Sequence, residues 1–302
     1  MLKPDTLLQN RYNIIRHVGQ GGMGAVYEAS DQRLGNTVAL KQMLLPSVES
    51  PPTDAIHSSM RRAFEREARI LASLRHSALP RVIDHFADPV GQFLLMEFIP
   101  GPDIGALHKE RGGPFDLDTV LLWADQLLDA LDYLHTQIPP VIHRDIKPQN
   151  LKPGPRGQLI LLDFGLAKGL ARAQAQSTTG DSLMGYTPQY APLEQIEGGS
   201  VDVRSDLYSL AATLYHLVTN APPADALQRA TALLQGRTDP LRPAHEIVSG
   251  LPRAISAVLT HGLAMNPEAR PDSAATMQGR SVSFKFWGLM SRWTTVGVRV
   301  CR

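Results

Sequence analysis

The sequence predicts an α+β fold of two lobes, in which a small antiparallel β-sheet with one helix precedes a mostly helical region. One observation is that short apolar strand patterns, separated by glycine-containing turns, fill most of residues 11–99. Another is that apolar stripes at helical spacing dominate residues 100–280. Between these regions the chain is broken by Pro100-Gly101-Pro102, where we place the lobe boundary. A chain of 302 residues can form two such lobes around a cleft.

In the first lobe, residues 12–41 predict three strands separated by a glycine turn and by the turn Gly35-Asn36. Residues 46–52, rich in proline and serine, predict a loop. A helix is expected over residues 60–74, and two further strands near residues 81–86 and 92–98. The helix is predicted because apolar side chains recur at helical spacing, at Phe64, Ala68, Leu71 and Leu74.

In the second lobe, an apolar stripe from Val120 to Leu134 predicts one long helix. Short strands are expected near Leu151 and over residues 159–162. Residues 207–218 are apolar nearly all round, which indicates a buried helix. Two more helices are predicted, over residues 254–265 and 273–277, and residues 281–302 form a short tail without an assignment.

Composition excludes several classes of protein. The net charge of +1 gives no reason to expect nucleic acid or an acidic membrane surface as a partner. The single cysteine, Cys301, allows no internal disulfide, which fits a reducing compartment. The N-terminus lacks the apolar core of a signal peptide, and no stretch has the ~18 uninterrupted apolar residues of a membrane span. The sequence therefore predicts a soluble, cytoplasmic protein.

The segment that carries most chemistry is residues 143–150, His-Arg-Asp-Ile-Lys-Pro-Gln-Asn, which places an acid, a base and an amide on one short loop. After an apolar run comes a second motif, Asp163-Phe164-Gly165. Upstream, residues 19–26 have the pattern G-x-G-x-x-G-x-V, in which backbone N–H groups can approach phosphate oxygens. A dinucleotide-binding loop would need a helix after the glycines. A strand pattern follows instead, which favours a phosphate-covering hairpin.

Lys41 ends an apolar strand, and Glu67 lies on the inward face of the helix predicted over residues 60–74. A carboxylate on an apolar face is costly unless it is paired, and Lys41 is the natural cation. We therefore expect a Lys41–Glu67 ion pair.

With these motifs in this order, the chain resembles the eukaryotic-like serine/threonine protein kinases, particularly their bacterial branch, over residues 11–280. The resemblance implies a bilobal kinase domain, with lobes over residues 11–99 and 100–280, that transfers the γ-phosphate of ATP to serine or threonine. It implies that Asp145 accepts the hydroxyl proton and that Lys147 steadies the γ-phosphate. It also implies that Lys41 reaches the α- and β-phosphates, and that Asn150 and Asp163 hold Mg²⁺, with Mn²⁺ as an alternative.

The resemblance also implies an adenine pocket. Met96 takes the gatekeeper position, and Glu97 to Ile99 form the hinge whose backbone hydrogen-bonds adenine. Lys152 departs from the family pattern, because an apolar residue usually forms the floor of this pocket. We expect its aliphatic stem to serve as the floor and its ammonium to extend into water, so that Lys152→Leu leaves ATP binding unchanged or improved. The nucleotide-binding residues implied are Gly19, Gln20, Gly21, Gly22, Gly24, Val26, Ala39, Lys41, Met96, Glu97, Ile99 and Lys152.

Other positions match scaffolding of the family. Asp206 matches an aspartate that anchors the catalytic loop, and Glu194 and Arg270 match a buried ion pair, although the usual Ala-Pro-Glu reads Pro192-Leu193-Glu194. His143, Phe164 and Leu71 match members of a hydrophobic spine. Between Asp163 and Glu194 we expect an activation segment switched on by autophosphorylation, with Arg144 and Lys168 as phosphate docks. Its hydroxyl residues are Ser177, Thr178, Thr179, Ser182 and Thr187, and Thr187 matches a threonine that contacts the catalytic aspartate and lysine.

Two other functions remain open from the sequence. A pseudokinase would bind ATP and act as a regulatory scaffold, but such proteins usually lack one of the residues present here as Lys41, Asp145 and Asp163. A small-molecule phosphotransferase on the same fold would not need an activation segment with Thr187 and Glu194. The expected partners are proteins that carry serine or threonine, and a second copy of this chain during autophosphorylation.

Overall fold

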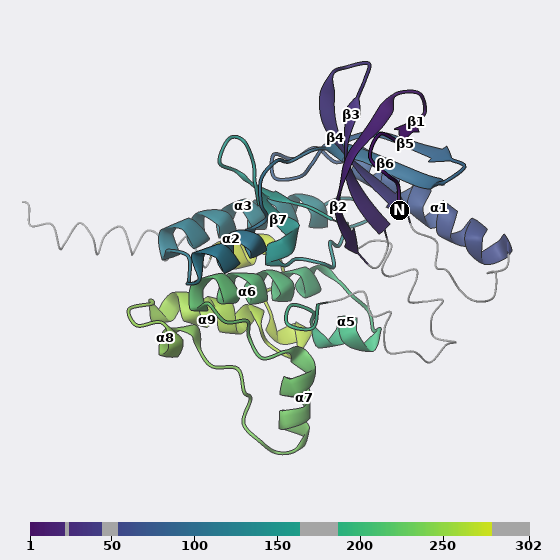
Figure 1. Ribbon diagram of the computed structural model, residues 1–302. Helices are drawn as coiled ribbons and strands as arrows, with labels where there is room; N and C mark the ends of the chain where they lie inside the picture. The colour runs from purple at the N-terminus through teal and green to yellow at the C-terminus, as the bar shows by residue number, and fades with distance from the viewer. Residues whose placement is uncertain (22–23, 44–53, 164–186, 280–302) are drawn as a thin grey trace, which may run out of the picture. The chain divides into compact units, whose positions relative to one another are not determined.

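The computed structural model describes residues 1–21, 24–43, 54–163 and 187–279 (Figure 1). The chain divides into two compact units. The first consists of residues 1–104 together with a second stretch that begins at Asn150, and the second contains residues 105–149 and the chain from Thr187 onward.

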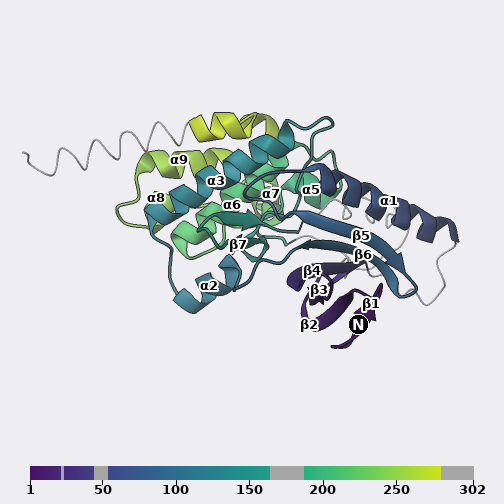
Figure 2. The ribbon, with the colours of Figure 1, turned by 90° about the horizontal axis from the view of Figure 1, so that it is seen from above.

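The first unit is built on a six-stranded antiparallel sheet with the order β1-β2-β3-β4-β6-β5. Helix α1 (Asp54–Ser73) packs along β5, which is followed most easily in Figure 2. The strands are β1 (Leu7–Leu8), β2 (Tyr12–Gly21), β3 (Gly24–Asp31), β4 (Asn36–Met43), β5 (Val82–Asp88) and β6 (Gly91–Glu97).

Alternation along the strands sends every second side chain into the core of this sheet. On β3 the buried residues are Ala25, Tyr27 and Ala29, and on β4 they are Val38 and Leu40. Because its neighbour Leu40 points into this core, Lys41 leaves β4 on the opposite face. The sheet thus buries one face and offers the other for polar chemistry.

A two-stranded ribbon completes the described part of the first unit. Strand β7 (Leu151–Pro153) pairs with β8 (Leu159–Leu161), and Lys152 lies opposite Ile160. Leu151 is fully buried, so Lys152 projects from the other face of the ribbon. The ribbon is tied to the rest of the unit by a backbone hydrogen bond of 2.8 Å from Leu161 N to Ala78 O.

The second unit surrounds helix α6 (Val203–Thr219), which is buried on nearly all sides and packs against α3 (Leu117–His135) and α9 (Arg253–Gly262). Gly262 permits the close approach of α9, because a Cβ there would lie 2.7 Å from Ala211 Cβ. The remaining helices are α2 (Ile104–Arg111), α5 (Leu193–Glu197), α7 (Ala226–Leu234), α8 (Ala244–Ile247) and an unlabelled one over residues 274–279. Two short 3-10 helices cover Pro148–Asn150 and Pro267–Ala269.

These elements confirm the predicted α+β class and the predicted strands of the sheet. The prediction was wrong at the start of the first helix, which begins at Asp54 rather than at residue 60. The extra turns carry few apolar residues, so they give no periodic signal. The short strand β1, the helices α2, α5, α7 and α8, and the two 3-10 helices were not predicted. The predicted loop over residues 46–52 lies outside the described residues.

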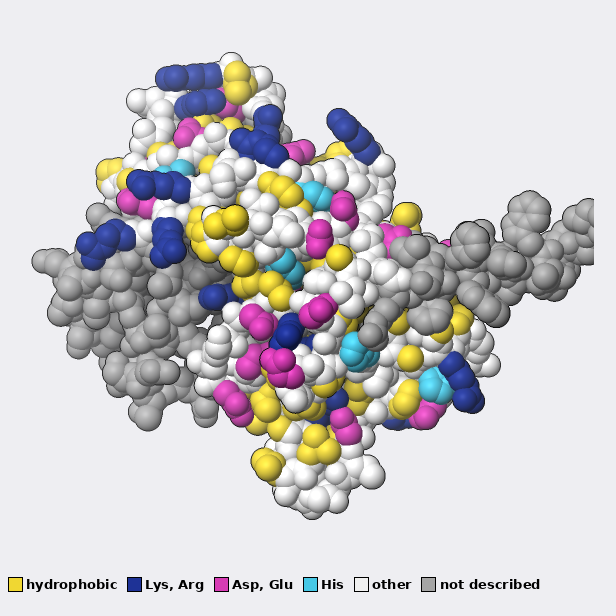
Figure 3. Space-filling model, turned by 180° about the vertical axis from the view of Figure 1, so that it is seen from behind, with side chains coloured by type: hydrophobic (Ala, Val, Ile, Leu, Met, Phe, Trp, Pro, Cys, Tyr) yellow, Lys and Arg dark blue, Asp and Glu magenta, His cyan; other side chains and the backbone are white. Residues whose placement is uncertain are grey.

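The surface charge differs between regions of the chain. On the face drawn in Figure 3, Lys and Arg side chains are frequent over the sheet-containing unit, whereas Asp and Glu side chains gather on the helical unit.

Candidate active site

Lys41 and Asp163 meet within the first unit, although 122 positions separate them in the sequence. The Lys41 Nζ atom lies 3.3 Å from Asp163 Oδ1, and the lysine side chain is only 18% exposed. Asp163 follows β8 with a φ of 54°, in the left-handed region that residues other than glycine seldom adopt. Such backbone strain persists where the surroundings fix a side chain for function. Glu67 lies on α1, but its side chain falls outside the described residues, so the Lys41–Glu67 pair stays a prediction.

Asn150 lies close to the chain that leads into Asp163. Leu162 N donates a 2.7 Å hydrogen bond to the main-chain oxygen of Asn150, and the Asn150 side chain is buried. Amide and carboxylate oxygens are the hard ligands that Mg²⁺ prefers, and Mg²⁺ usually takes one or two carboxylates plus substrate phosphates. Among the described residues, no group of three or more His, Cys, Asp and Glu side chains forms a full metal cage. The amide of Asn150 and the carboxylate of Asp163 are oxygen ligands of the kind that a divalent metal ion shared with a phosphate ligand takes.

The glycine-rich loop joins β2 to β3. Gly19 and Gly21 lie at the end of β2, with Gln20 between them, and Gly24 begins β3. A Cβ atom on Gly24 would lie 2.2 Å from the main-chain oxygen of Gln42, so this position requires glycine. Gly22 lies outside the described residues. Val26 and Ala39 follow on β3 and β4, where Ala39 pairs with Met96.

Lys152 corrects one expectation. Its ammonium binds the protein backbone, whereas the expectation was that it extends into water. Nζ donates a 2.8 Å hydrogen bond to the main-chain oxygen of Ile99, at the end of the segment predicted to bind adenine. The ring of Phe98 lies 5.8 Å from the same nitrogen. The acceptor lies 53 positions away in the sequence, so no local pattern pointed to it.

In the second unit, Asp206 organises the loop that contains residues 143–145. Its carboxylate is fully buried on α6 and accepts hydrogen bonds of 2.8 Å from the main-chain nitrogens of His143 and Arg144. His135 Nε2 lies 3.0 Å from the same carboxylate. The sequence did not indicate this role for His135, because there the residue only marks the end of a long predicted helix.

Asp145, Lys147 and Thr187 form a contiguous polar group. Lys147 Nζ lies 3.2 Å and 3.1 Å from the two carboxylate oxygens of Asp145. It also donates to Thr187 Oγ1 at 3.1 Å. The main-chain nitrogen of Asp145 approaches His143 Nδ1 at 3.3 Å, so the buried imidazole helps to fix the position of the aspartate. The carboxylate of Asp145 is a hydrogen-bond acceptor, and the ammonium of Lys147 is a cation next to it. One small reacting group could therefore contact both.

Arg144 has a φ of 67°, a strained value for a side chain of this size. Gln195 Nε2 donates to its main-chain oxygen at 2.9 Å, a contact that the sequence did not reveal. The Arg144 Nε atom is buried, and no acceptor among the described residues pairs with it.

The other predicted parts of the switch lie outside the described residues. They are Phe164, Lys168, Ser177, Thr178, Thr179 and Ser182.

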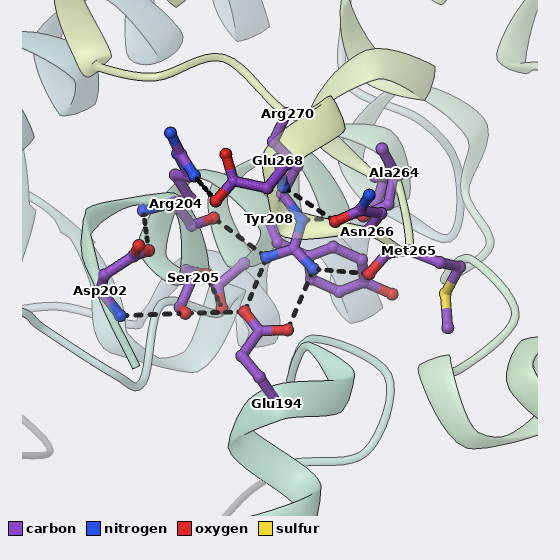
Figure 4. Close-up of polar contacts among 12 residues, drawn as sticks. Glu194, Asp202, Arg204, Ser205, Tyr208, Ala264, Met265, Asn266, Glu268 and Arg270 are labelled. Atoms are coloured by element: carbon purple, nitrogen blue, oxygen red, sulfur yellow. Dashed lines mark hydrogen bonds and ion pairs between the residues drawn. The ribbon is translucent and has the colours of Figure 1, made fainter. Parts of the chain in front are cut away.

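Glu194 and Arg270 form a two-armed ion pair beside α6 (Figure 4), with distances of 2.7 Å and 3.0 Å. The Arg270 side chain is 0% exposed and also donates to the main-chain oxygens of Ala264 and Met265. Ser205, in the first turn of α6, donates to Glu194 at 2.7 Å. Burial would raise the pKa of Glu194, but hydrogen bonds from Arg270 and Ser205 hold it below its ordinary 4.5. The pair therefore fixes α5 to α6 above that pH and loosens as the pH falls below it.

Glu194→Gln is expected to lower the free energy of unfolding by about 3 kcal/mol, because a fully buried guanidinium loses its counter-charge. The estimate is at the low end of the range for breaking a buried pair, since main-chain oxygens still bind Arg270. Urea unfolding at neutral pH measures it.

The matched control is Glu268→Gln. Glu268 pairs with Arg204 in the same region (Figure 4), but its side chain is 75% exposed. An exposed pair is worth ~0–1 kcal/mol. Equal losses from the two variants would show that burial of the Glu194 pair is unimportant.

Comparison with known proteins identifies the family and the fold of this chain. The family model described as "Protein kinase domain" matches residues 12–280. The "DNA damage-responsive serine/threonine-protein kinase RqkA" of Deinococcus radiodurans is 33% identical over 97% of this chain and 42% of its own length. "Serine/threonine-protein kinase PknB" of Mycobacterium tuberculosis is 33% identical over 90% of this chain and 42% of its own length. The chain thus spans about two fifths of these relatives.

Solved structures show the same fold. "PpkA-294 apo form" superposes with a TM-score of 0.74 at 24% identity, covering 93% of this chain and 99% of that one. The PknI kinase domain of M. tuberculosis superposes with a TM-score of 0.69 at 26% identity, covering 94% of this chain and all of that one.

Within the described residues, every helix is too short or too polar to cross a lipid bilayer.

Proposed function

The chain belongs to the protein kinase family, and from that premise we propose that it transfers the γ-phosphate of ATP to serine and threonine hydroxyls of proteins. The observation that carries the proposal is the polar group of Asp145, Lys147 and Thr187. A carboxylate and an ammonium that share a hydrogen bond can take a proton and balance negative charge at one place. Thr187 adds a hydroxyl that holds the ammonium in position.

In the proposed reaction, Asp145 accepts the proton of the incoming serine or threonine hydroxyl as the hydroxyl oxygen attacks the γ-phosphorus atom. The bond between that phosphorus and the oxygen bridging to the β-phosphate breaks, and ADP leaves. Lys147 balances the charge that spreads over the phosphoryl oxygens in the transition state. Asp206 acts through the backbone, since its two hydrogen bonds to His143 and Arg144 hold the loop on which Asp145 lies. This rigidity matters because phosphoryl transfer depends chiefly on positioning and on electrostatic stabilisation.

Lys41, Asn150 and Asp163 are assigned to the nucleotide. Lys41 would bind the α- and β-phosphates, and Asn150 and Asp163 would hold Mg²⁺, with Mn²⁺ as an alternative. The bound ion would neutralise charge on the β- and γ-phosphate oxygens. The 3.3 Å contact between Lys41 and Asp163 supports this assignment, because it brings a phosphate-binding cation and a metal-binding carboxylate together. The backbone of Glu97 to Ile99 is assigned to adenine.

The activity is tested by incubating the purified chain with γ-labelled ATP, Mg²⁺ and a protein substrate rich in serine and threonine, such as casein. Label is expected in protein, and EDTA should abolish its transfer. A scaffold without catalytic activity would bind ATP but leave protein unlabelled. A small-molecule phosphotransferase would label added small acceptors and leave both casein and the chain itself unlabelled.

Phosphorylation of the segment between Asp163 and Glu194 is expected to raise activity at least severalfold, with Thr178 or Thr179 as the main site. A phosphate adds roughly −1.5 to −2 charge and orders a loop when a cation receives it. Arg144 is the proposed dock, because its buried Nε has no acceptor among the described residues. Phosphosite mapping by mass spectrometry and rate measurements before and after phosphatase treatment test this expectation. Equal rates for the two forms would refute the switch.

Two further assignments follow from the same proposal. Autophosphorylation between molecules makes a second copy of the chain a transient partner, so labelling of the chain should accelerate with its own concentration. A first-order rate that is independent of concentration would instead indicate transfer within one molecule. Because ATP is an intracellular substrate, the proposed activity also assigns this domain to the cytoplasm.

A further inference from the structure

The ammonium of Lys152 makes a contact with Ile99 that the proposed reaction does not use. Lys152 lies on β7 opposite Ile160 and projects away from the buried Leu151. Its Nζ atom donates a 2.8 Å hydrogen bond to the main-chain oxygen of Ile99. The ribbon and the segment after β6 therefore meet through one charged hydrogen bond within the first unit.

The Ile99 carbonyl has a particular need for this partner. Ile99 is 4% exposed, and a buried carbonyl without a hydrogen bond is costly. The next residues offer little help, because Pro100 and Pro102 have no N–H group. The sheet ladder has also ended, since β6 stops at Glu97. Lys152 is thus the side chain that satisfies a carbonyl which the local backbone cannot.

Burial, neighbouring charges and one aromatic ring all act on the Lys152 ammonium. Burial lowers the pKa of Lys152, whereas the carboxylates of Asp103 and Glu28 oppose that effect and Arg16 adds to it. The ring of Phe98 at 5.8 Å adds a weaker attraction. A lysine in such a setting loses side-chain freedom and hydration, and the hydrogen bond to Ile99 offsets that loss.

We propose that Lys152 is a positioning residue for the nucleotide base, because its ammonium fixes the main-chain carbonyl of Ile99 and so the backbone that binds adenine. The proposal rests on the proposed function, in which Glu97 to Ile99 receive the base. The hydrogen bond holds the peptide group after Ile99 in one orientation, so the backbone of Glu97 to Ile99 already has its binding conformation before the nucleotide binds. This preorganisation raises the affinity for ATP without a new contact to the phosphates. The effect should therefore depend on the presence of the base.

The test measures the dissociation constants of ATP and of inorganic tripolyphosphate, each with Mg²⁺, by calorimetry on the full chain. Lys152→Met keeps the apolar stem and removes the ammonium. We expect ATP to bind about tenfold more weakly, since a hydrogen bond from a charged donor has this order of effect. Tripolyphosphate, which has no base, should bind the variant and the original chain alike. In turnover, the KM for ATP should rise while kcat changes little.

The matched control is Lys109→Met, which removes an exposed ammonium on α2 and should change neither constant. Unchanged ATP affinity in Lys152→Met would overturn the proposal. An equal loss of affinity for ATP and for tripolyphosphate would also overturn it, because it would indicate a general structural defect. If the original chain binds tripolyphosphate but not ATP, the proposed function fails as well, and that result is visible without any variant.

Discussion

Replacing Asp145 by Asn is expected to lower phosphoryl transfer by about 10²–10⁴-fold, the range that a positioned general base contributes. The change removes the proton-accepting charge but almost no volume. The hydrogen bonds from His143 and Arg144 to Asp206 hold the loop independently of the Asp145 side chain, so the fold should persist. Initial rates of label transfer from γ-labelled ATP measure the loss.

Two controls accompany this variant. ATP should bind Asp145→Asn nearly as well as the original chain, because the nucleotide is assigned to other residues. Asp129→Asn, on an exposed position of α3, should leave the rate unchanged. If Asp145→Asn retains near-normal turnover, Asp145 is not the proton acceptor.

Replacing Lys41 by Met is expected to lower transfer by about 10²–10³-fold, comparable with the loss of one preorganised group that stabilises transition-state charge. The phosphates lose a cation, and Asp163 loses the ammonium at 3.3 Å. The Met side chain preserves most of the packing on β4. The same labelled-ATP assay measures the effect, with circular dichroism to verify the fold.

The predicted pair of Lys41 with Glu67 makes this variant part of a double-mutant cycle. Lys41→Met, Glu67→Gln and the double change should be clearly non-additive, because paired groups act as one unit. Additive losses would contradict the pair and leave Asp163 as the residue that positions Lys41.

The fold was largely predictable because its signals are local. In the first unit, strand alternation around glycine turns marked β2, β3 and β4. In the second unit, the helical stripe from Val120 to Leu134 marked α3. Short elements gave no such signal. Strand β1 has two residues, and α8 has four, which is barely one turn. Their positions depend on tertiary packing and not on periodicity.

The site was predictable where its chemistry is concentrated in short motifs, as at residues 143–150 and at Asp163. Contacts between distant segments were harder. The hydrogen bond from Lys152 to Ile99 joins two residues that no single motif contains, and the sequence alone led to the wrong environment for the ammonium. The same is true of His135, which supports Asp206 from another helix.

The central claim is that this chain phosphorylates serine and threonine, and the most direct measurement is phosphoamino-acid analysis after incubation with γ-labelled ATP and Mg²⁺. The purified chain and its Asp145→Asn variant are labelled in parallel, each with casein as acceptor. We predict phosphoserine or phosphothreonine with the original chain, no phosphotyrosine, and almost no label with the variant. An original chain that binds ATP but transfers no phosphate to either residue, or equal labelling by the two proteins, would contradict the claim.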